Sequence, residues 1–416
     1  MKKKILILIG FLTLFTSQFT LSILVPPSSL SWFYNARDEF ISVDMTADGK
    51  YIVAGTANGY VYLFEKSKPE PIQSYYIYDM VWLVDISEDG KYIVASQYSG
   101  HFFVFERSNS RQLWSYQNIH GLISKLKISP DGNYIAASYN NRLFLFNRTS
   151  STPLWNSTSY GAFAFSPTGD YLAAGTDNER IYLLDLISQV PIWGYIIYDV
   201  PFSIIISNDG ELTAVAGVEK KIYLYNKSST TPIWQFDVDS ELWCLDMSDD
   251  GNYIVTGSWN NKVSLFHRAN PIPLWTYTTN GEIDSVSISS DGRYIGAWNS
   301  RHMVYIFKRS HSTPVWSFKG PGDLEQWEYL RNPLKISSTG RYLAFVSDQV
   351  YFMDQTTPIL IAFGSLFLRN PITLVVECMI ATFISIIYKK KKEKIRDVND
   401  NEKVNLKRKS KISSDF

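Results

Sequence analysis

The sequence is poor in the residues and motifs from which most enzyme sites are built. It has only two cysteines, Cys244 and Cys378, which are too few for a disulfide framework or a cysteine-based zinc cluster. Its five histidines are scattered, and it contains no Gly-x-Ser-x-Gly, His-Glu-x-x-His, phosphate-loop or dinucleotide-binding motif. We therefore expect a protein that is not an enzyme and has no catalytic residues, no metal site and no cofactor.

Neither sign of charge is in excess, since 40 Lys and Arg residues balance 40 Asp and Glu residues. The distribution is uneven, because residues 389–416 carry eleven basic and five acidic side chains and Lys2, Lys3 and Lys4 follow the first residue. The rest of the chain is consequently acidic. Because phosphate binding requires clustered Lys and Arg, this body argues against nucleic acid as a partner.

What the sequence does contain is a repeat. A turn signal, Asp-Gly or Thr-Gly, recurs with its glycine at Gly49, Gly90, Gly132, Gly169, Gly210, Gly251, Gly292 and Gly340. Each unit holds short apolar runs of strand length, such as 232–236, 242–248, 253–257 and 263–266, separated by turn residues. Four short strands per period of about 40 residues are typical of a propeller blade. The sequence predicts an all-β, eight-bladed β-propeller of four-stranded antiparallel blades over residues 32–357.

The ends of the repeat region predict how the ring closes. Residues 32–34 have the length and composition of an outer strand, which would complete the blade formed by residues 334–354. The alternative is completion by residues 356–363. A tryptophan begins most units, while Gln73 takes this place in the second unit. We expect these indoles to pack between blades.

The repeats are flanked by two apolar segments. Residues 1–25 combine a basic start with a long uncharged run, and are either a cleaved signal peptide or an uncleaved signal anchor helix. Residues 371–388 are apolar and are followed at once by four lysines, which predicts a transmembrane helix with a basic, disordered cytoplasmic tail at 389–416. The expected location is the cell membrane, with the propeller outside the cytoplasm.

Propeller topology also predicts which face carries these segments. The chain enters before an outer strand and leaves after a third strand, so both ends should lie on the face that bears the Asp-Gly turns. We expect this turn face to lie toward the membrane and the opposite, outward face to be available to partners.

The repeats resemble the WD-repeat and quinoprotein-like (PQQ-like) propeller families. The resemblance rests on Ser-x-Asp-Gly-x-Tyr-Ile runs, as at 129–138 and 248–257, and on third strands of the Val-Tyr-Leu-Phe type. The Trp-Asp pair that ends third strands in WD repeats is replaced, for example by Phe64-Glu65, whereas the eight units are more similar to the quinoprotein-like group. The resemblance implies a fold and brings no activity, because the vicinal cysteine pair of the quinoprotein dehydrogenases is missing.

Two short patterns have alternative interpretations. The Asp-x-Ser/Thr-x-Asp-Gly runs at 44–49, 85–90 and 246–251 are similar to the start of a calcium loop, but they lack its final glutamate, so we interpret them as hairpin turns. Sequons begin at Asn147, Asn156 and Asn226 and are candidate N-glycosylation sites.

A binding site is expected where the repeats differ from one another. The residue eight places before the turn glycine varies, being Ile41, Trp82, Ser124, Gly161, Phe202, Trp243, Asp284 or Asn332, which predicts a position at the mouth of the channel. The longest interval adds a loop at 320–329, which is either a recognition element or a variant of loop length. The candidate partner-binding residues are Trp82, Trp243, Trp259, Asp284, Asp323, Glu325, Trp327 and Glu328.

These observations predict a membrane-anchored interaction scaffold or sensor that binds a protein partner on its outward face. The alternative is a module for a small ligand, such as a saccharide stacked on Trp82 and Trp243. A quinoprotein-type enzyme is the third possibility. The oligomeric state is unknown from the sequence.

Overall fold

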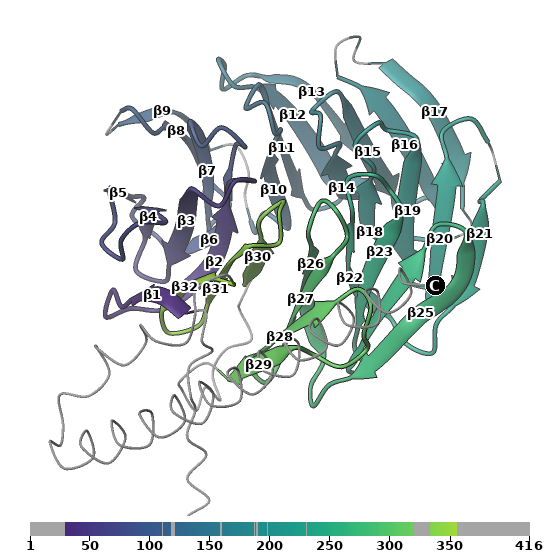
Figure 1. The fold of residues 1–416 in the computed structure, drawn as a ribbon. Helices are drawn as coiled ribbons and strands as arrows, with labels where there is room; N and C mark the ends of the chain where they lie inside the picture. Colours follow the sequence, from purple (N-terminus) through teal and green to yellow (C-terminus); the bar gives the residue numbers. More distant parts are fainter. Residues whose placement is uncertain are drawn as a thin grey trace, which may run out of the picture. The chain divides into compact units, whose positions relative to one another are not determined.

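The structure is a computed structural model that describes residues 30–355, except 110, 118–120, 159, 187, 189, 198, 230 and 320–332. The described residues form 32 strands in eight four-stranded antiparallel sheets, arranged as blades around a channel (Figure 1). This confirms the predicted eight-bladed propeller. The expected anchor segments at 1–25 and 371–388 and the tail at 389–416 lie outside the described residues.

Each blade has its innermost strand at the channel and its fourth strand at the rim. The innermost strands of blades 1 to 8 are β2 (Phe40–Met45), β6 (Val81–Ile86), β10 (Lys125–Ile128), β14 (Tyr160–Phe165), β18 (Pro201–Ile206), β22 (Leu242–Met247), β26 (Ile283–Ile288) and β30 (Leu334–Ile336). The second strands are β3 (Tyr51–Thr56), β7 (Tyr92–Gln97), β11 (Tyr134–Tyr139), β15 (Tyr171–Thr176), β19 (Leu212–Gly217), β23 (Tyr253–Ser258), β27 (Tyr294–Asn299) and β31 (Tyr342–Val346).

The two outer positions follow the same order. The third strands are β4 (Tyr60–Glu65), β8 (Phe102–Glu106), β12 (Arg142–Asn147), β16 (Arg180–Asp185), β20 (Lys221–Asn226), β24 (Lys262–His267), β28 (Met303–Lys308) and β32 (Val350–Asp354). The rim strands are β5 (Gln73–Tyr76), β9 (Gln112–Tyr116), β13 (Pro153–Thr158), β17 (Val190–Ile196), β21 (Trp234–Asp237), β25 (Asn270–Thr278), β29 (Trp316–Lys319) and, for blade 8, β1 (Leu30–Tyr34).

The Ser-x-Asp-Gly runs form the turns between the first and second strands. In blade 6 the Ser248 hydroxyl donates to the Asp250 carboxylate at 2.6 Å and accepts from the Tyr253 amide at 3.0 Å. The Gly251 amide donates to the Ser248 carbonyl, and Gly251 has a φ of +67°. Each residue of the motif therefore has a local role in the hairpin, because a side chain at the glycine would be strained.

At six of the eight interfaces, a tyrosine that begins the second strand connects such a turn to the preceding blade. Tyr51 of blade 1 lies against Gly90 of blade 2, where an added Cβ would come within 2.6 Å of the ring. The guanidinium of Arg107, also in blade 2, lies 4.0 Å from the centroid of the same ring. The ring is thus held between a glycine and a cation, so the turn glycine serves both backbone conformation and blade-to-blade packing.

The tryptophans of the rim strands add a hydrogen bond to the same interfaces. The indoles of Trp114, Trp234 and Trp275 donate to backbone carbonyls of the next blade at 2.6 to 2.8 Å. In blade 1, which lacks the indole, the Gln73 side-chain amide donates to the Asn109 carbonyl of blade 2 at 2.9 Å. The expectation that these residues join blades is confirmed for these positions.

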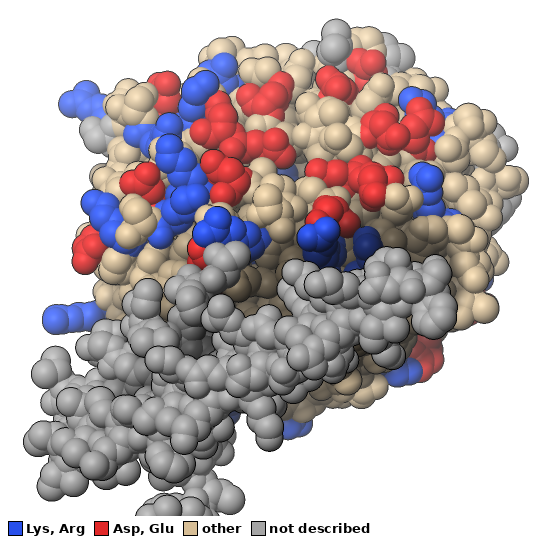
Figure 2. All heavy atoms as spheres, in the orientation of Figure 1, with Lys and Arg blue, Asp and Glu red and all other residues tan. Residues whose placement is uncertain are grey.

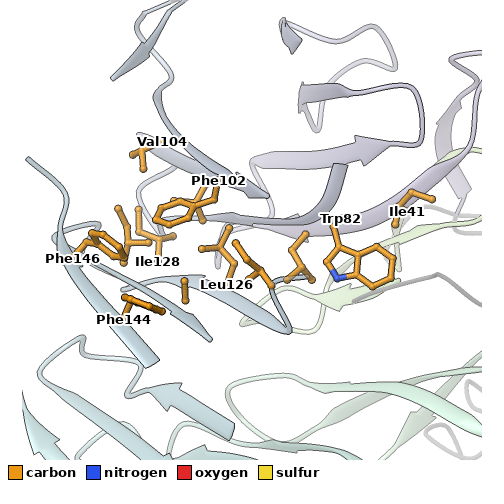
Figure 3. Close-up of a cluster of buried hydrophobic side chains, with 13 residues drawn as sticks. Ile41, Trp82, Phe102, Val104, Leu126, Ile128, Phe144 and Phe146 are labelled. Carbon is orange, nitrogen blue, oxygen red and sulfur yellow. The ribbon is translucent and has the colours of Figure 1, made fainter. Parts of the chain in front are cut away.

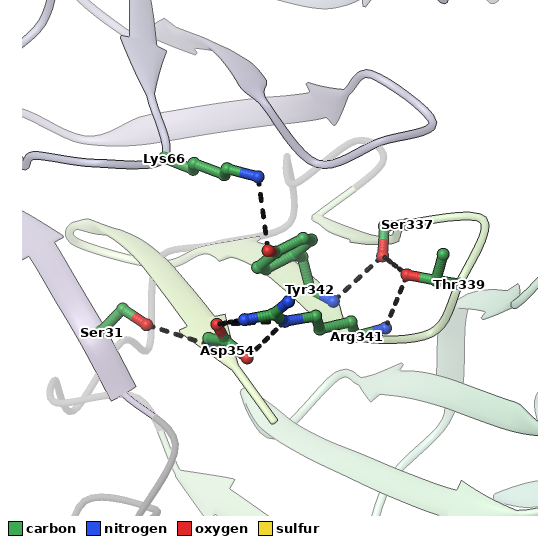
Figure 4. A network of polar contacts seen from close by, with 7 residues as sticks. All are labelled: Ser31, Lys66, Ser337, Thr339, Arg341, Tyr342 and Asp354. Atoms are coloured by element: carbon green, nitrogen blue, oxygen red, sulfur yellow. Dashed lines mark hydrogen bonds and ion pairs between the residues drawn. The ribbon is translucent and has the colours of Figure 1, made fainter. Parts of the chain in front are cut away.

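Blade 8 is completed by β1, as predicted. Strand β1 pairs antiparallel with β32, and the purple and yellow-green ends of the described chain lie side by side in Figure 1. Trp32 stacks on Phe352 with centroids 5.2 Å apart, and its indole donates to the Lys66 carbonyl of blade 1 at 2.9 Å. The Lys66 ammonium donates to the Tyr342 hydroxyl at 3.3 Å (Figure 4). The residues that close the ring thus repeat the interface found between other blades.

Both ends of the described propeller lie on the turn face. Asp354 pairs with Tyr342, directly after the last turn, and Leu30 pairs with Met353. The Arg341 guanidinium binds the Asp354 carboxylate through two nitrogens, the nearer contact being 2.8 Å (Figure 4). The described part of the chain thus begins and ends on one face, as the topology predicts. Within the part of the chain that the structure describes, no helix has the length and apolarity needed to cross a membrane.

We predict that Trp32→Ala strongly destabilises the propeller. Trp32 is 8 % exposed and makes both a ring stack and an inter-blade hydrogen bond. Removing a buried aromatic side chain of this kind costs about 3–5 kcal/mol. Urea unfolding of the purified full-length protein would measure the change in the free energy of unfolding.

The matched control is Val315→Ala, because Val315 is 47 % exposed beside the rim strand of blade 7. That change should stay within about 0.5 kcal/mol. Equal effects of the two substitutions would contradict closure of the ring through Trp32.

Candidate functional site

The variable position eight residues before the turn glycine is a β-bulge. In blades 5, 6 and 7 the pairing of the first two strands shifts between Pro201 and Ser203, between Leu242 and Cys244, and between Ile283 and Ser285. The extra residues are Phe202, Trp243 and Asp284. A bulge removes a residue from the regular pairing and redirects its side chain. This explains why the position varies between blades on the outward face while the surrounding ladder is kept.

An aromatic stack occupies this position in blades 5 and 6. The rings of Phe202 and Trp243 have centroids 4.6 Å apart, and Trp243 stacks on Trp259 at 5.1 Å with 28° between the planes. Trp259 comes from the turn between β23 and β24 and is 42 % exposed, while Phe202 is 44 % exposed. We call these three residues the aromatic patch. It presents a large apolar surface to solvent at the outward end of two adjacent blades.

The aromatic patch extends to Val200 and Val218, which are 38 % and 47 % exposed and joined by a backbone hydrogen bond of 3.1 Å. Charged residues of both signs follow these positions in the sequence. Glu219 and Lys220 come directly after Val218, and Lys262 forms an ion pair with Asp239. Elsewhere on the molecule, Figure 2 likewise shows acidic and basic side chains interspersed over the visible face. An apolar centre with a rim of mixed charge is the usual composition of a protein-binding surface.

Trp82 does not belong to this exposed surface. It is only 2 % exposed and lies in a core cluster with Ile41 of blade 1 (Figure 3). Its ring meets Tyr98 edge-on at 5.3 Å. The expectation that Trp82 is available to stack on a ligand is therefore corrected, because its neighbours in blades 1 and 2 already cover the indole.

The remaining predicted binding residues are in different places. Asp284 is half-buried at the bulge of blade 7, next in the ring after Trp243. Asp323, Glu325, Trp327 and Glu328 lie outside the described residues. Cys244 follows Trp243 directly, and its thiol donates to the Ile283 carbonyl at 3.8 Å. Burial raises the pKa of the Cys244 thiol, so the thiol stays protonated and unreactive at neutral pH.

Two of the three predicted glycosylation asparagines end third strands, where each accepts hydrogen bonds from the turn that follows. The Asn147 side-chain oxygen accepts from the hydroxyl of Thr149 at 2.7 Å, and the Asn226 side-chain oxygen accepts from the amide of Ser228 at 2.9 Å. Asn156 is exposed on the rim strand of blade 3. Glycosylation at these positions stays a prediction.

A second candidate site lies in the channel on the turn face. A cavity of about 250 Å³ is lined by residues from all eight innermost strands and the turns that follow them. The residue five places before each turn glycine faces this cavity. Around the ring from blade 1 these are Asp44, Asp85, Lys127, Ala164, Ile205, Asp246, Ser287 and Lys335.

The carboxylates of this ring join neighbouring blades. Asp85 accepts the amide of Ile128 in blade 3 at 2.8 Å, and Asp246 accepts the amide of Ile288 in blade 7 at 2.8 Å. Innermost strands are sheet edges, so these amides have no strand partner on the channel side. The carboxylates supply that partner, which gives them a structural role in addition to their charge.

Ion pairs neutralise only part of the ring. Lys127 binds Asp85, and the ammonium of Lys335 lies 3.8 Å from Asp44. Burial opposes ionisation of Asp44, but the ammonium groups of Lys335 and Lys127 outweigh it and hold the pKa of Asp44 below its usual value. Burial raises the pKa of Asp246, which has backbone amides as partners but no cation within 4 Å among the described residues.

The calcium-loop pattern does not gather its acidic residues at one point. Asp44 accepts the amide of Ile86 from the neighbouring blade at 3.1 Å, whereas Asp48 binds the Thr46 hydroxyl inside its own turn at 2.7 Å. Among the described residues, no group of three His, Cys, Asp or Glu side chains is placed to hold a metal ion. The geometry agrees with the interpretation of these runs as hairpin turns.

Comparison with known proteins shows which propellers this fold is similar to. Residues 231–267 match the family model "WD domain, G-beta repeat". The fold is similar to the C-terminal WD40 domain of Sif2, with a TM-score of 0.66, 14 % identity and coverage of 76 % of this chain and 96 % of that one. It is also similar to the β-propeller domain of Cps50 (Swd1) from Myceliophteria thermophila, with a TM-score of 0.52, 13 % identity and coverage of 63 % and 94 %. No curated protein matches the sequence. The fold is thus similar to that of WD40 β-propellers, and one repeat matches the WD-domain model.

Sequence reasoning missed parts of both sites. The position eight residues after the turn glycine holds Tyr98, Val218 and Trp259 and lies beside the bulge, yet residue type alone predicts only Trp259 as a binding residue. The channel ring was missed because its members share a position but not a chemistry. The signal that reveals this ring is the residue five places before each turn glycine, once the units are aligned on those glycines.

We predict that Asp246→Asn changes how stability depends on pH. A carboxyl group whose pKa is raised by folding loses stabilising free energy as pH rises from the unfolded value of about 3.9 through the folded value. Asparagine keeps an acceptor for the Ile288 amide but does not ionise. The free energy of unfolding of Asp246→Asn should therefore increase relative to that of the wild type between pH 4 and pH 8, because only the wild type loses stability over this range. Urea titrations at both pH values test this, and a difference that does not vary with pH would contradict it.

Proposed function

We propose that the protein is a non-enzymatic, membrane-anchored scaffold that binds a protein partner through the aromatic patch on its outward face. The observation that carries this proposal is the exposed stack of Phe202, Trp243 and Trp259. Tryptophans that expose a flat face at the centre of a surface commonly contribute most of the binding energy in protein complexes. Both WD40 neighbours support an interaction role at the level of the fold alone.

The chemistry of the partner follows from the composition of the patch. Its apolar centre requires an apolar segment, preferably with an aromatic or long aliphatic anchor that fits against Trp243 and Trp259. The rim of mixed charge, including Glu219 and Lys220, requires charges of both signs around that segment. A nucleic acid satisfies neither requirement, because it offers a uniformly negative backbone.

The orientation in the membrane forms part of the proposal. Both described ends of the propeller lie on the turn face, so anchors at 1–25 and 371–388 hold that face toward the bilayer. The aromatic patch on the opposite face then points away from the membrane, outside the cytoplasm. This orientation would also place Asn156, the predicted glycosylation site exposed on the rim, outside the cytoplasm.

A saccharide ligand is the second candidate, since sugars also bind on exposed indole faces. The stack of Trp243 on Trp259 supports it, whereas Trp82 no longer does because it is buried. The two candidates differ in the size of surface that they use. A sugar needs the face of one or two indoles, while a protein partner also contacts Phe202 and the valines at the edge.

The experiment is site-specific photo-crosslinking of the full-length protein in its native membrane. A photoreactive phenylalanine analogue at position 259 should give links to one polypeptide species. The same probe at Ile272, which is 64 % exposed on the rim strand of the same blade, should give none. Links that are identical from the two positions, or confined to this chain at good coverage, would contradict a protein partner on the patch.

Substitution provides the second arm of the test. We predict that Trp243→Ala, made in the protein that carries the probe at Val218, reduces the crosslinked product by about 30-fold, the loss expected for a central aromatic contact. Leu274→Ala, at a residue that is 53 % exposed on the rim, should leave the yield unchanged. If the probes at positions 259 and 218 both fail to form a crosslink, but Trp243→Ala abolishes retention on an immobilised oligosaccharide, the saccharide candidate replaces the proposal.

A further inference from the structure

The channel cavity on the turn face is divided into sectors of different chemistry. Blade 3 supplies Lys125 and Lys127, and blade 6 supplies Asp246 and Asp249. The two blades between them contribute apolar side chains, among them Ala164, Pro167 and Ile205. An apolar wall is therefore bordered by ammonium groups on one side and by carboxylates on the other.

The lysine sector keeps one positive charge without an ionic partner. Lys127 forms an ion pair with Asp85. Among the described residues, no carboxylate lies within 4 Å of the Lys125 ammonium. This ammonium lies 5.3 Å from the centroid of the Phe163 ring. Burial, together with repulsion from Lys127, lowers the pKa of Lys125 to about 8. A bound anion would remove this penalty, because a nearby opposite charge favours the charged form.

In the described part of the chain, the carboxylate sector lacks a cation in direct contact, as the lysine sector lacks an anion for one of its two ammonium groups. Asp246 is held in place by the amides of Ile288 at 2.8 Å and Met247 at 3.0 Å, so its position is fixed by the backbone of two blades. Neither amide carries a charge, and burial raises the pKa of this carboxyl group although the Lys335 ammonium partly opposes the shift. Asp249, in the turn after the same strand, also lines the cavity. A bound ammonium group would supply the missing cation.

We propose that the channel cavity binds a small zwitterion with an apolar body, of the amino-acid class, whose carboxylate contacts Lys125 and whose ammonium group contacts Asp246. The volume of about 250 Å³ suits a molecule of this size, since drug-sized ligands occupy roughly 300–1,000 Å³. Ala164 and Ile205 provide the surface for its apolar part. This site is on the face opposite to the aromatic patch and does not depend on the proposed protein partner.

The test is calorimetric titration of the purified full-length protein with four probes. Leucine and 6-aminohexanoate carry both charges at different separations, whereas 4-methylpentanoate lacks the ammonium group and 3-methylbutylamine lacks the carboxylate. At least one zwitterion should bind, and both singly charged probes should bind about tenfold more weakly or worse, because a hydrogen bond to a charged group is lost in each. Absence of binding by both zwitterions at 10 mM, a ligand concentration about ten times a Kd of 1 mM, would overturn the proposal.

Two substitutions that retain shape locate the site. Lys125→Met keeps the side-chain stem over Phe163, and Asp246→Asn keeps an acceptor for the Ile288 amide, so both variants should fold. Each should weaken zwitterion binding by about tenfold or more. The controls are Lys308→Met, at an exposed position of a third strand, and Asp237→Asn, whose side chain is 79 % exposed. Equal binding by all four variants, or equal affinity for zwitterions and singly charged probes, would overturn the assignment.

Discussion

The propeller depends on a contact that recurs between its blades, in which the ring of a tyrosine lies against the turn glycine of the next blade. At the closing interface an added Cβ on Gly49 would come within 2.3 Å of Tyr342, and the Lys66 ammonium lies 4.7 Å from the centroid of that ring. The glycine is therefore required twice, once for its positive φ and once for its lack of a side chain. Because the contact joins neighbouring blades at six of the eight interfaces, most blades position the next one in this way, and the ring is complete only when the last blade meets the first.

This constraint divides each repeat into fixed and variable positions. The turn and the tyrosine that follows it are committed to the blade interface and differ little between units. The bulge residue and the channel residue take no part in the tyrosine–glycine contact, and their side chains range from indole to carboxylate and from lysine to alanine. The rigid ring thus carries one variable side chain per blade on each of its two faces. The aromatic patch and the channel cavity form where the variable side chains of adjacent blades lie together.

The sequence was sufficient to predict the architecture and much less sufficient to predict the sites. Strand number, blade number and closure by Trp32 followed from the period and from the turn chemistry, which are local properties. The burial of Trp82 could not be predicted, because it depends on Ile41 in another blade and on the edge of Tyr98. Trp243, with the same residue type at the same position, is half-exposed because its neighbours are Phe202 and Trp259. The difference lies in the packing between units, which periodicity does not describe.

The most direct test of the central claim, that the outward face of blades 5 and 6 is a contact surface, is hydroxyl-radical footprinting of the protein in its native membrane and after purification. Indoles are oxidised readily when solvent reaches them, and Trp259 is 42 % exposed in the isolated chain. The account predicts that oxidation of Trp259 falls several-fold in the native membrane, while oxidation of the exposed rim residue Leu274 does not change. Equal oxidation of Trp259 in both preparations would contradict it.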